Sequence, residues 1–253
     1  MNEKWNVLRP NLRAVVDLGA APGGWSQVVS RTLGWDGVPR GVEGEEEVQD
    51  PLAMWEAIKD STTEERHVST SGVIVAVDKL AMRPIPGVST LQADFLQPST
   101  ASRIKEMLST RFNRDGKADL ILSDVGANQS GNRIRDVEQS LEICHAVLQF
   151  ARRHLRNDDI ELGGKEAKDR GGVLLYAFQF PGVPKTEAPT TTYVHIRLKH
   201  FAHPDVDEFR KEDLKPNFRE VHYLKPSSSR SESSEGYFLC RGWRGDNKKF
   251  GLV

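Results

Sequence analysis

The sequence has little cysteine and no long apolar run. Its 253 residues include two cysteines, Cys144 and Cys240, which are too few for a disulfide framework or a zinc site. Both lie in apolar surroundings, so we expect two buried free thiols and no bound metal. No apolar stretch approaches the roughly 20 residues needed to cross a bilayer, and we therefore expect no membrane partner.

A strong overall charge is also missing, but the charges that are present are unevenly distributed. The formal net charge is −1, whereas residues 36–71 contain ten acids and three bases, which leaves the rest of the chain at +6. A moderately basic body is compatible with a polyanionic partner, and equally with an ordinary solvated surface. We interpret 36–71 as an inserted loop within a single domain spanning residues 1–253.

Apolar runs and helical periodicity alternate along the chain. Strands are predicted at 15–18, 73–77, 88–91, 118–122, from 173, and at 193–200. Amphipathic or short helices are predicted at 26–33, 100–112, 137–155 and 205–214, and a closing hairpin at 221–224 with 236–241. Strands that alternate with helices indicate an α/β fold whose parallel sheet is covered on both faces.

The most informative stretch follows the first predicted strand. It reads Asp-Leu-Gly-Ala-Ala-Pro-Gly-Gly-Trp-Ser-Gln over residues 17–27. Its glycines allow close approach of a ligand to the backbone, and Pro22 stiffens the turn. The spacing is neither G-x-G-x-x-G nor a P-loop, which excludes a typical dinucleotide or nucleoside triphosphate loop. As a bare glycine-rich turn it fits a purely structural role equally well.

The order of residues 17–27 resembles the S-adenosylmethionine (SAM) loop of the FtsJ-like ribose 2′-O-methyltransferases. The resemblance implies a Rossmann-like SAM-dependent methyltransferase fold with a mostly parallel seven-stranded sheet, an antiparallel closing hairpin and helices on both faces. It also implies that SAM is the cofactor and that the loop binds it through Gly19, Pro22, Gly23, Gly24 and Trp25.

Three acids follow predicted strands, namely Asp78, Asp94 and Asp124. Ligands of doubly wound sheets bind at the carboxyl ends of the strands, and a carboxylate accepts from two vicinal hydroxyls. We interpret Asp78 as the ribose ligand and Asp94 as the adenine ligand. Residues 123–131 resemble the family segment Ser-Asp-x-x-x-Asn-x-Ser-Gly, and the resemblance implies that Asp124 is a catalytic acid that also borders the cofactor. Capping of the next helix is the alternative role for Asp124.

The segment 225–240 resembles a second family pattern, Lys-Pro-x-Ser-Ser-Arg followed by a glutamate just before a strand. Glu235 matches that glutamate, and the nearby Glu232 is the alternative. The family uses a Lys-Asp-Lys-Glu set. The first lysine lies in a helix upstream of the SAM loop, for which Lys4 is no convincing substitute, so we expect the chain to begin downstream of that helix.

The second lysine of the set requires an insertion in this chain. In the family it follows a Gly-Gly strand as Lys-x-Phe, where this sequence has Tyr176-Ala177-Phe178. The same pattern recurs at Lys199-His200-Phe201, 36 positions before Glu235. We therefore predict an insertion at about 176–196, either a genuine loop or a translated intron, and Lys199 as the catalytic lysine. A surface lysine on an edge strand is the alternative.

The resemblance implies methylation of a ribose 2′-hydroxyl in RNA, most closely a uridine of mitochondrial large-subunit rRNA within a pre-ribosomal particle. A monomer and a mitochondrial location are expected, with cytoplasm or nucleolus as alternatives. Competing functions are a tRNA or mRNA-cap ribose methyltransferase and an inactive SAM-fold protein that binds RNA or the ribosome. Candidate phosphate contacts are Arg133, Arg135, Lys225 and Arg230.

Overall fold

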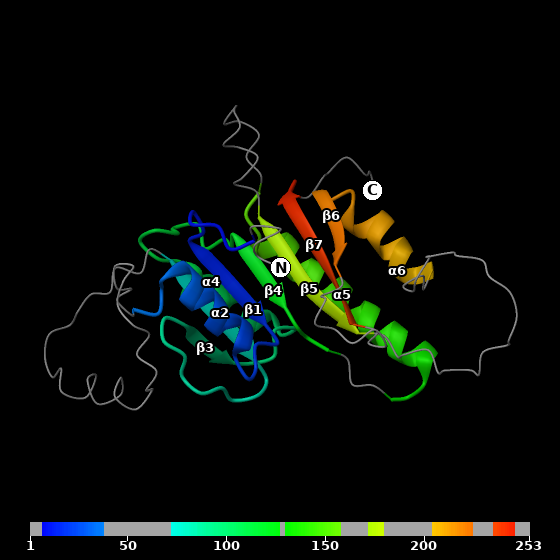
Figure 1. Cartoon of the computed structure of the whole chain (residues 1–253), viewed down its shortest axis with the longest axis horizontal. Coiled ribbons are helices and arrows are strands. Elements are labelled where there is room, and N and C mark those ends of the chain that lie inside the picture. Colours follow the sequence, from blue (N-terminus) through cyan, green and yellow to red (C-terminus); the bar gives the residue numbers. More distant parts are fainter. Residues whose placement is uncertain are drawn as a thin grey trace, which may run out of the picture.

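The computed structural model describes residues 7–37, 72–126, 130–157, 172–179, 204–224 and 235–245 (Figure 1). Its centre is a seven-stranded sheet in the order β3-β2-β1-β4-β5-β7-β6. The strands are β1 (Ala14–Leu18), β2 (Val73–Asp78), β3 (Ser89–Gln92), β4 (Leu120–Ser123), β5 (Val173–Gln179), β6 (Phe218–Leu224) and β7 (Glu235–Trp243).

The first five strands in chain order are parallel, and the last two close the sheet in antiparallel fashion. β1 lies between β2 and β4, with Leu18 paired to Val77 on one side and Ser123 on the other. All five residues of β1 are buried, because strands of a parallel sheet are covered on both faces. β7 runs antiparallel to both β5 and β6. The predicted fold class is confirmed.

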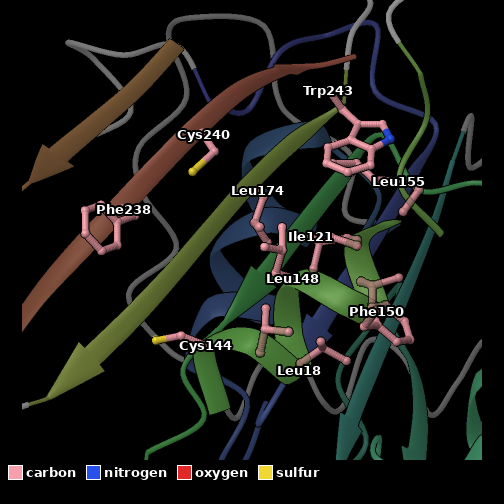
Figure 2. Close-up of a cluster of buried hydrophobic side chains, with 14 of the residues drawn as sticks. Leu18, Ile121, Cys144, Leu148, Phe150, Leu155, Leu174, Phe238, Cys240 and Trp243 are labelled. Carbon is pink, nitrogen blue, oxygen red and sulfur yellow. The ribbon is translucent and has the colours of Figure 1, made fainter. Parts of the chain in front are cut away.

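Helices cover both faces of the sheet (Figure 1). Helix α2 (Gly24–Leu33) packs on one face, where Val29 joins a core cluster with Val15 and Leu122. The helices α4 (Pro98–Leu108) and α5 (Arg133–His154) pack on the other face. There α5 places Cys144, Leu148 and Phe150 against apolar side chains of the strands, as Figure 2 shows. A short helix, α6 (Pro204–Glu208), continues into a π-helical segment, Phe209–Leu214.

The two cysteines are free and buried, as predicted. Burial raises the pKa of the Cys144 thiol to about 12 and raises that of Cys240 as well. Both thiols therefore stay protonated at neutral pH and act as small apolar side chains. Within the described ranges, no helix is long and apolar enough to span a membrane.

Several elements differ from their predicted bounds. Helix α5 begins at Arg133, four residues earlier than predicted, because Asn132 caps it: the Asn132 Oδ1 atom accepts from the N–H groups of Ile134 and Arg135 at 3.1 and 3.3 Å. Helix α4 ends at Leu108 rather than at residue 112. β5 continues to Gln179, so the first four residues of the predicted insertion at 176–196 belong to this strand. The predicted strand at 193–200 and nearly all of 36–71 lie outside the described residues.

Candidate cofactor and catalytic site

The glycine-rich loop leaves β1 in a fixed turn. The backbone N–H groups of Gly19 and Ala20 both donate to the carbonyl of Val77 at the end of β2, at 2.9 and 3.1 Å. Gly19 has a φ of +72°, and a Cβ atom there would lie 2.7 Å from Val125 Cγ2. A side chain at this position would be strained and would collide with the segment that follows β4.

The far end of the loop starts helix α2. Gly23 has a φ of +114°, and a Cβ atom there would lie 2.3 Å from Ile85 Cδ1. Its carbonyl accepts the first helical hydrogen bond, from the N–H of Gln27 at 2.9 Å. Pro22 is exposed, and a Cβ atom on Gly24 would meet no heavy atom within 4 Å. The tip of the loop therefore borders open space, where a ligand can approach the backbone.

Asp78 ends β2 and holds the loop in place. Its Oδ2 atom accepts from the N–H of Ala21 at 2.9 Å, and its Oδ1 atom accepts from the N–H of Leu80 at 2.8 Å. Each carboxylate oxygen can accept more than one hydrogen bond. Asp78 therefore fixes the loop across 57 residues of sequence and retains acceptor capacity for a ribose hydroxyl, the role predicted for it.

Asp94 lies two residues after β3, and the neighbouring strand β2 ends in Asp78 at the same sheet edge. Its Oδ1 atom accepts from the N–H of Leu96 at 3.0 Å, and its Oδ2 atom lies 3.0 Å from Lys79 Nζ. Partial burial raises the pKa of Asp94, but the Leu96 hydrogen bond and the Lys79 ammonium outweigh it and lower the pKa overall. Asp94 is therefore ionised and fixed in position at the sheet edge.

Asp124 follows β4 directly and is exposed. Its backbone N–H donates to the carbonyl of Leu18 at 3.1 Å, which places it beside the start of the glycine-rich loop. The cap of the next helix is Asn132 rather than Asp124, so the capping alternative is wrong. The buried Asp136 orders the turn before that helix: it accepts from the N–H and hydroxyl of Ser130, both at 2.7 Å, and these bonds lower its pKa.

A further carboxyl group, Asp17, lies buried under the loop and was missed by sequence reasoning. It is 1% exposed, and its Oδ2 atom accepts from Ser26 Oγ at 2.6 Å, whereas its Oδ1 atom has no hydrogen-bond partner among the described residues. Burial raises the pKa of Asp17 to about 6, against the Ser26 hydrogen bond; the charges of Asp124 and Asp78 add to the rise. The sequence did contain a signal for this residue, because an acid within an otherwise apolar strand is unusual in a protein core.

Glu235 and Trp25 come to the same edge from other elements. Glu235 is the first residue of β7 and pairs in register with Gln179 at the carboxyl end of β5. Two residues further on, the Tyr237 ring stacks on Trp25 of α2, with ring centroids 5.8 Å apart. The backbone of Glu235 therefore lies at the sheet edge where Asp124 follows β4.

The lysine predicted for the catalytic set, Lys199, lies outside the described residues. The backbone of Tyr176 occupies the Gly-Gly strand, paired with Ser123 on one side and Phe238 on the other. Of the predicted phosphate contacts, Arg135 is exposed at the start of α5, whereas Lys225 and Arg230 lie outside the described residues. Among the described residues, no group of three histidine, cysteine or acidic side chains is placed to hold a metal ion.

The residues present fit a cofactor that combines an adenosine with a positive charge. Three carboxyl groups, of Asp17, Asp78 and Asp124, lie at the carboxyl ends of the neighbouring strands β1, β2 and β4, and the charges of Asp78 and Asp124 raise the pKa of Asp17. A cation bound there relieves that repulsion. The loop packs closely on Val125 and Ile85 at Gly19 and Gly23, and it borders open space at Gly24, where the backbone is accessible to a ligand.

Comparison with known proteins agrees with this geometry. The sequence model of the FtsJ-like methyltransferase family matches residues 1–243. The chain belongs to the FtsJ-like methyltransferase family. Among curated relatives, "Ribosomal RNA large subunit methyltransferase E" of Xanthobacter autotrophicus is 30% identical over 97% of this chain and 67% of its own length. The protein of the same name from Pseudomonas aeruginosa is 30% identical over 97% of this chain and 82% of its own.

A solved structure supports the fold assignment. The crystal structure of a Plasmodium falciparum protein assigned to the ribosomal RNA methyltransferases has a TM-score of 0.58 and 20% identity, covering 96% of this chain and 93% of that one. For this FtsJ-like protein the loop, Asp78, Asp94 and Asp124 therefore sit on the expected fold. The two curated relatives named above are bacterial, so closeness to the mitochondrial branch stays a prediction.

Proposed function

We propose that this FtsJ-like protein transfers the methyl group of SAM to a ribose 2′-hydroxyl of large-subunit ribosomal RNA, and that the target is a uridine in mitochondria. The observation that carries the proposal is the set of carboxyl groups around the glycine loop at one sheet edge. The names of the curated relatives support ribosomal RNA as the substrate. A pre-ribosomal particle is the proposed setting, with the protein acting as a monomer.

The loop and its neighbouring acids would bind and orient the cofactor. Bound SAM supplies an electrophilic methyl group. The backbone between Gly19 and Trp25 would pack against it, Asp78 would accept from the ribose hydroxyls, and Asp94 would accept from the adenine amino group. Because Asp78 and Asp94 are already held by backbone N–H groups, they present their oxygens without a large entropic cost on binding.

Asp124, Lys199 and Glu235 would act on the acceptor ribose. Catalysis requires the hydroxyl oxygen, methyl carbon and sulfur in line and the removal of a weakly acidic proton. As a neutral amine, Lys199 would take that proton; as an ammonium, it would orient the hydroxyl and stabilise the developing alkoxide. The two carboxylates favour the ammonium, so we propose the orienting role.

Replacing Lys199 with alanine tests this assignment. We expect transfer of labelled methyl from SAM to ribosome-derived large-subunit rRNA to fall by about 100-fold or more, with SAM affinity nearly unchanged. Lys215→Ala, an exposed lysine at the end of the π-helical segment, is the matched control and should retain activity. Transfer by the Lys199→Ala protein at the wild-type rate would eliminate Lys199 as a catalytic residue, and tRNA as acceptor distinguishes the substrate class.

One observation favours a second candidate function, an inactive SAM-fold protein that binds RNA. The strand next to β4 carries Tyr176 where the family has lysine, and its backbone is paired there on both sides. This reading predicts binding of large-subunit rRNA and SAM without any methyl transfer by the wild-type chain. Measurable methyl transfer to RNA by the wild-type protein would exclude the inactive RNA-binding function.

A further inference from the structure

A concentration of positive charge lies away from the cofactor edge. Between residues 103 and 117 the sequence holds five bases and two acids, in a chain whose net charge is −1. These residues form the second half of α4 and the segment that leads to β4. Arg153, in the last turn of α5, adds a further cation. We call this set the basic surface: Arg103, Lys105, Arg111, Arg114, Lys117 and Arg153.

The two ends of the basic surface are joined in space. The Lys117 Nζ atom donates to the carbonyl oxygen of Arg153 at 2.7 Å, and Ala118 forms a parallel bridge with Leu155. The buried imidazole of His154 lies among the cations, and its pKa falls to about 4 because of burial first and then the charges of Lys117, Lys105 and Arg153. These groups therefore converge on one side of the molecule.

Asp115 and Asp119, two of the three acids nearby, share one arginine, and the third, Glu106, is exposed. Asp115 and Asp119 both accept from the guanidinium of Arg156, with 2.6 Å between Arg156 Nε and Asp119 Oδ1. Within the part of the chain that the structure describes, no carboxylate forms an ion pair with Lys105 or Arg114, and both are exposed. The surface therefore carries uncompensated positive charge.

The basic surface belongs to the opposite end of the sheet from the cofactor site. Ala118 precedes β4 and Asp124 follows it, so at about 3.3 Å per residue the two lie about 20 Å apart. Along α5, the exposed acids Glu138 and Glu142 separate the two regions. A continuous strand of nucleic acid would meet these negative charges, so the surface suits a different segment of a large folded polyanion.

We propose that the basic surface is a second RNA-binding surface, which holds phosphates of the same ribosomal RNA at a segment remote from the methylated nucleotide. The proposal rests on the proposed function, because it takes the RNA substrate from there. Exposed, unpaired lysine and arginine side chains bind phosphates and release condensed counterions, without reading sequence. Stabilisation of the carboxyl ends of α4 and α5 by Lys105 and Arg153 is the competing explanation.

The test compares two double variants of equal charge. Lys105→Gln with Arg114→Gln removes two cations of the basic surface, whereas Arg31→Gln with Lys215→Gln removes two exposed cations elsewhere. Affinity for large-subunit rRNA is measured as a function of salt for both variants and the wild type. Each phosphate contact contributes about 0.7–0.9 to the slope of log affinity against log salt.

We expect the slope of the first variant to fall by about 1.5, and its affinity at low salt to drop by about tenfold or more. The control variant should match the wild type, and SAM affinity should be unchanged in both. Equal RNA affinity and slope in the two double variants would overturn the proposal. So would wild-type RNA binding by the Lys105→Gln, Arg114→Gln variant together with a lower unfolding temperature, which would assign these side chains a role in stability only. If the wild type itself binds no large-subunit rRNA, the proposed function fails instead.

Discussion

Replacing Asp17 with asparagine should remove a pH-dependent penalty on folding. The carboxyl group is 1% exposed, and burial raises its pKa from 3.8 to about 6. Between these values the folded protein retains a proton that the unfolded chain has lost, so the stability of the wild type falls as pH rises through this window. The penalty approaches its full size only above the folded-state pKa of about 6.

The size of the effect follows from the pKa difference. A rise of about two units corresponds to about 3 kcal/mol in the free energy of unfolding at high pH, of which roughly 1.5 kcal/mol develops between about pH 5 and pH 8. The variant can still accept the Ser26 hydroxyl. Its NH₂ group replaces Oδ1, which has no partner among the described residues, and a buried unpaired donor costs about 1–3 kcal/mol. The change with pH is therefore the measured quantity.

Urea unfolding followed by tryptophan fluorescence, at a series of pH values from about 5 to 8, measures this difference. The stability of the wild type relative to Asp17→Asn should decline by roughly 1.5 kcal/mol over that range. Glu138→Gln, an exposed carboxylate on α5, controls for loss of charge and should run parallel to the wild type. Parallel curves for Asp17→Asn would refute the reasoning, since Asp17 would then be ionised throughout.

Two further perturbations have defined outcomes. The buried His154, whose ring stacks on Phe150 with 4.3 Å between centroids, has a pKa near 4, so the folded protein loses stability as pH falls from about 6.5 towards 4. His154→Gln should remove about 2–3 kcal/mol of that loss in unfolding measurements over this pH range. An unchanged pH dependence between 6.5 and 4 would contradict the prediction. Gly19→Ala should destabilise the fold by about 2 kcal/mol or more, through its positive φ and the contact with Val125. The control Gly24→Ala, with open space around the added Cβ, should be near neutral in thermal unfolding.

The interior of the sheet was predictable because it depends on local pattern. Buried parallel strands are continuous apolar runs, and β1, β2 and β4 were each placed to within two residues. The start of α5 was missed because capping side chains mark it, whereas the prediction relied on the helical repeat of apolar residues. Asn132 and the Ser130–Asp136 hydrogen bond come before the first apolar residue of that repeat. The sequence Ser-Gly-Asn before the helix contained that signal.

The site was predictable where motif and topology coincide. Asp78 ends β2 and Asp124 follows β4, the two parallel strands on either side of β1, so the fold brings both to one sheet edge once the strand order is known. Asp17 was not predicted because a buried carboxyl group contradicts the apolar pattern that identifies a core strand. The length of β5 was underestimated for a related reason: its last residues pair with β7, more than fifty positions later, and only that partner extends the strand to Gln179.

The same pairing constrains how Lys199 can act. β5 lies between β4 and β7, with Tyr176 bonded in register to Ser123 and to Phe238. A second strand therefore has no free edge beside β4, because β1 occupies the other side. The catalytic role proposed for Lys199 therefore requires that it act on Asp124 while β5 keeps these pairings, and Tyr176→Phe should then leave methyl transfer unchanged.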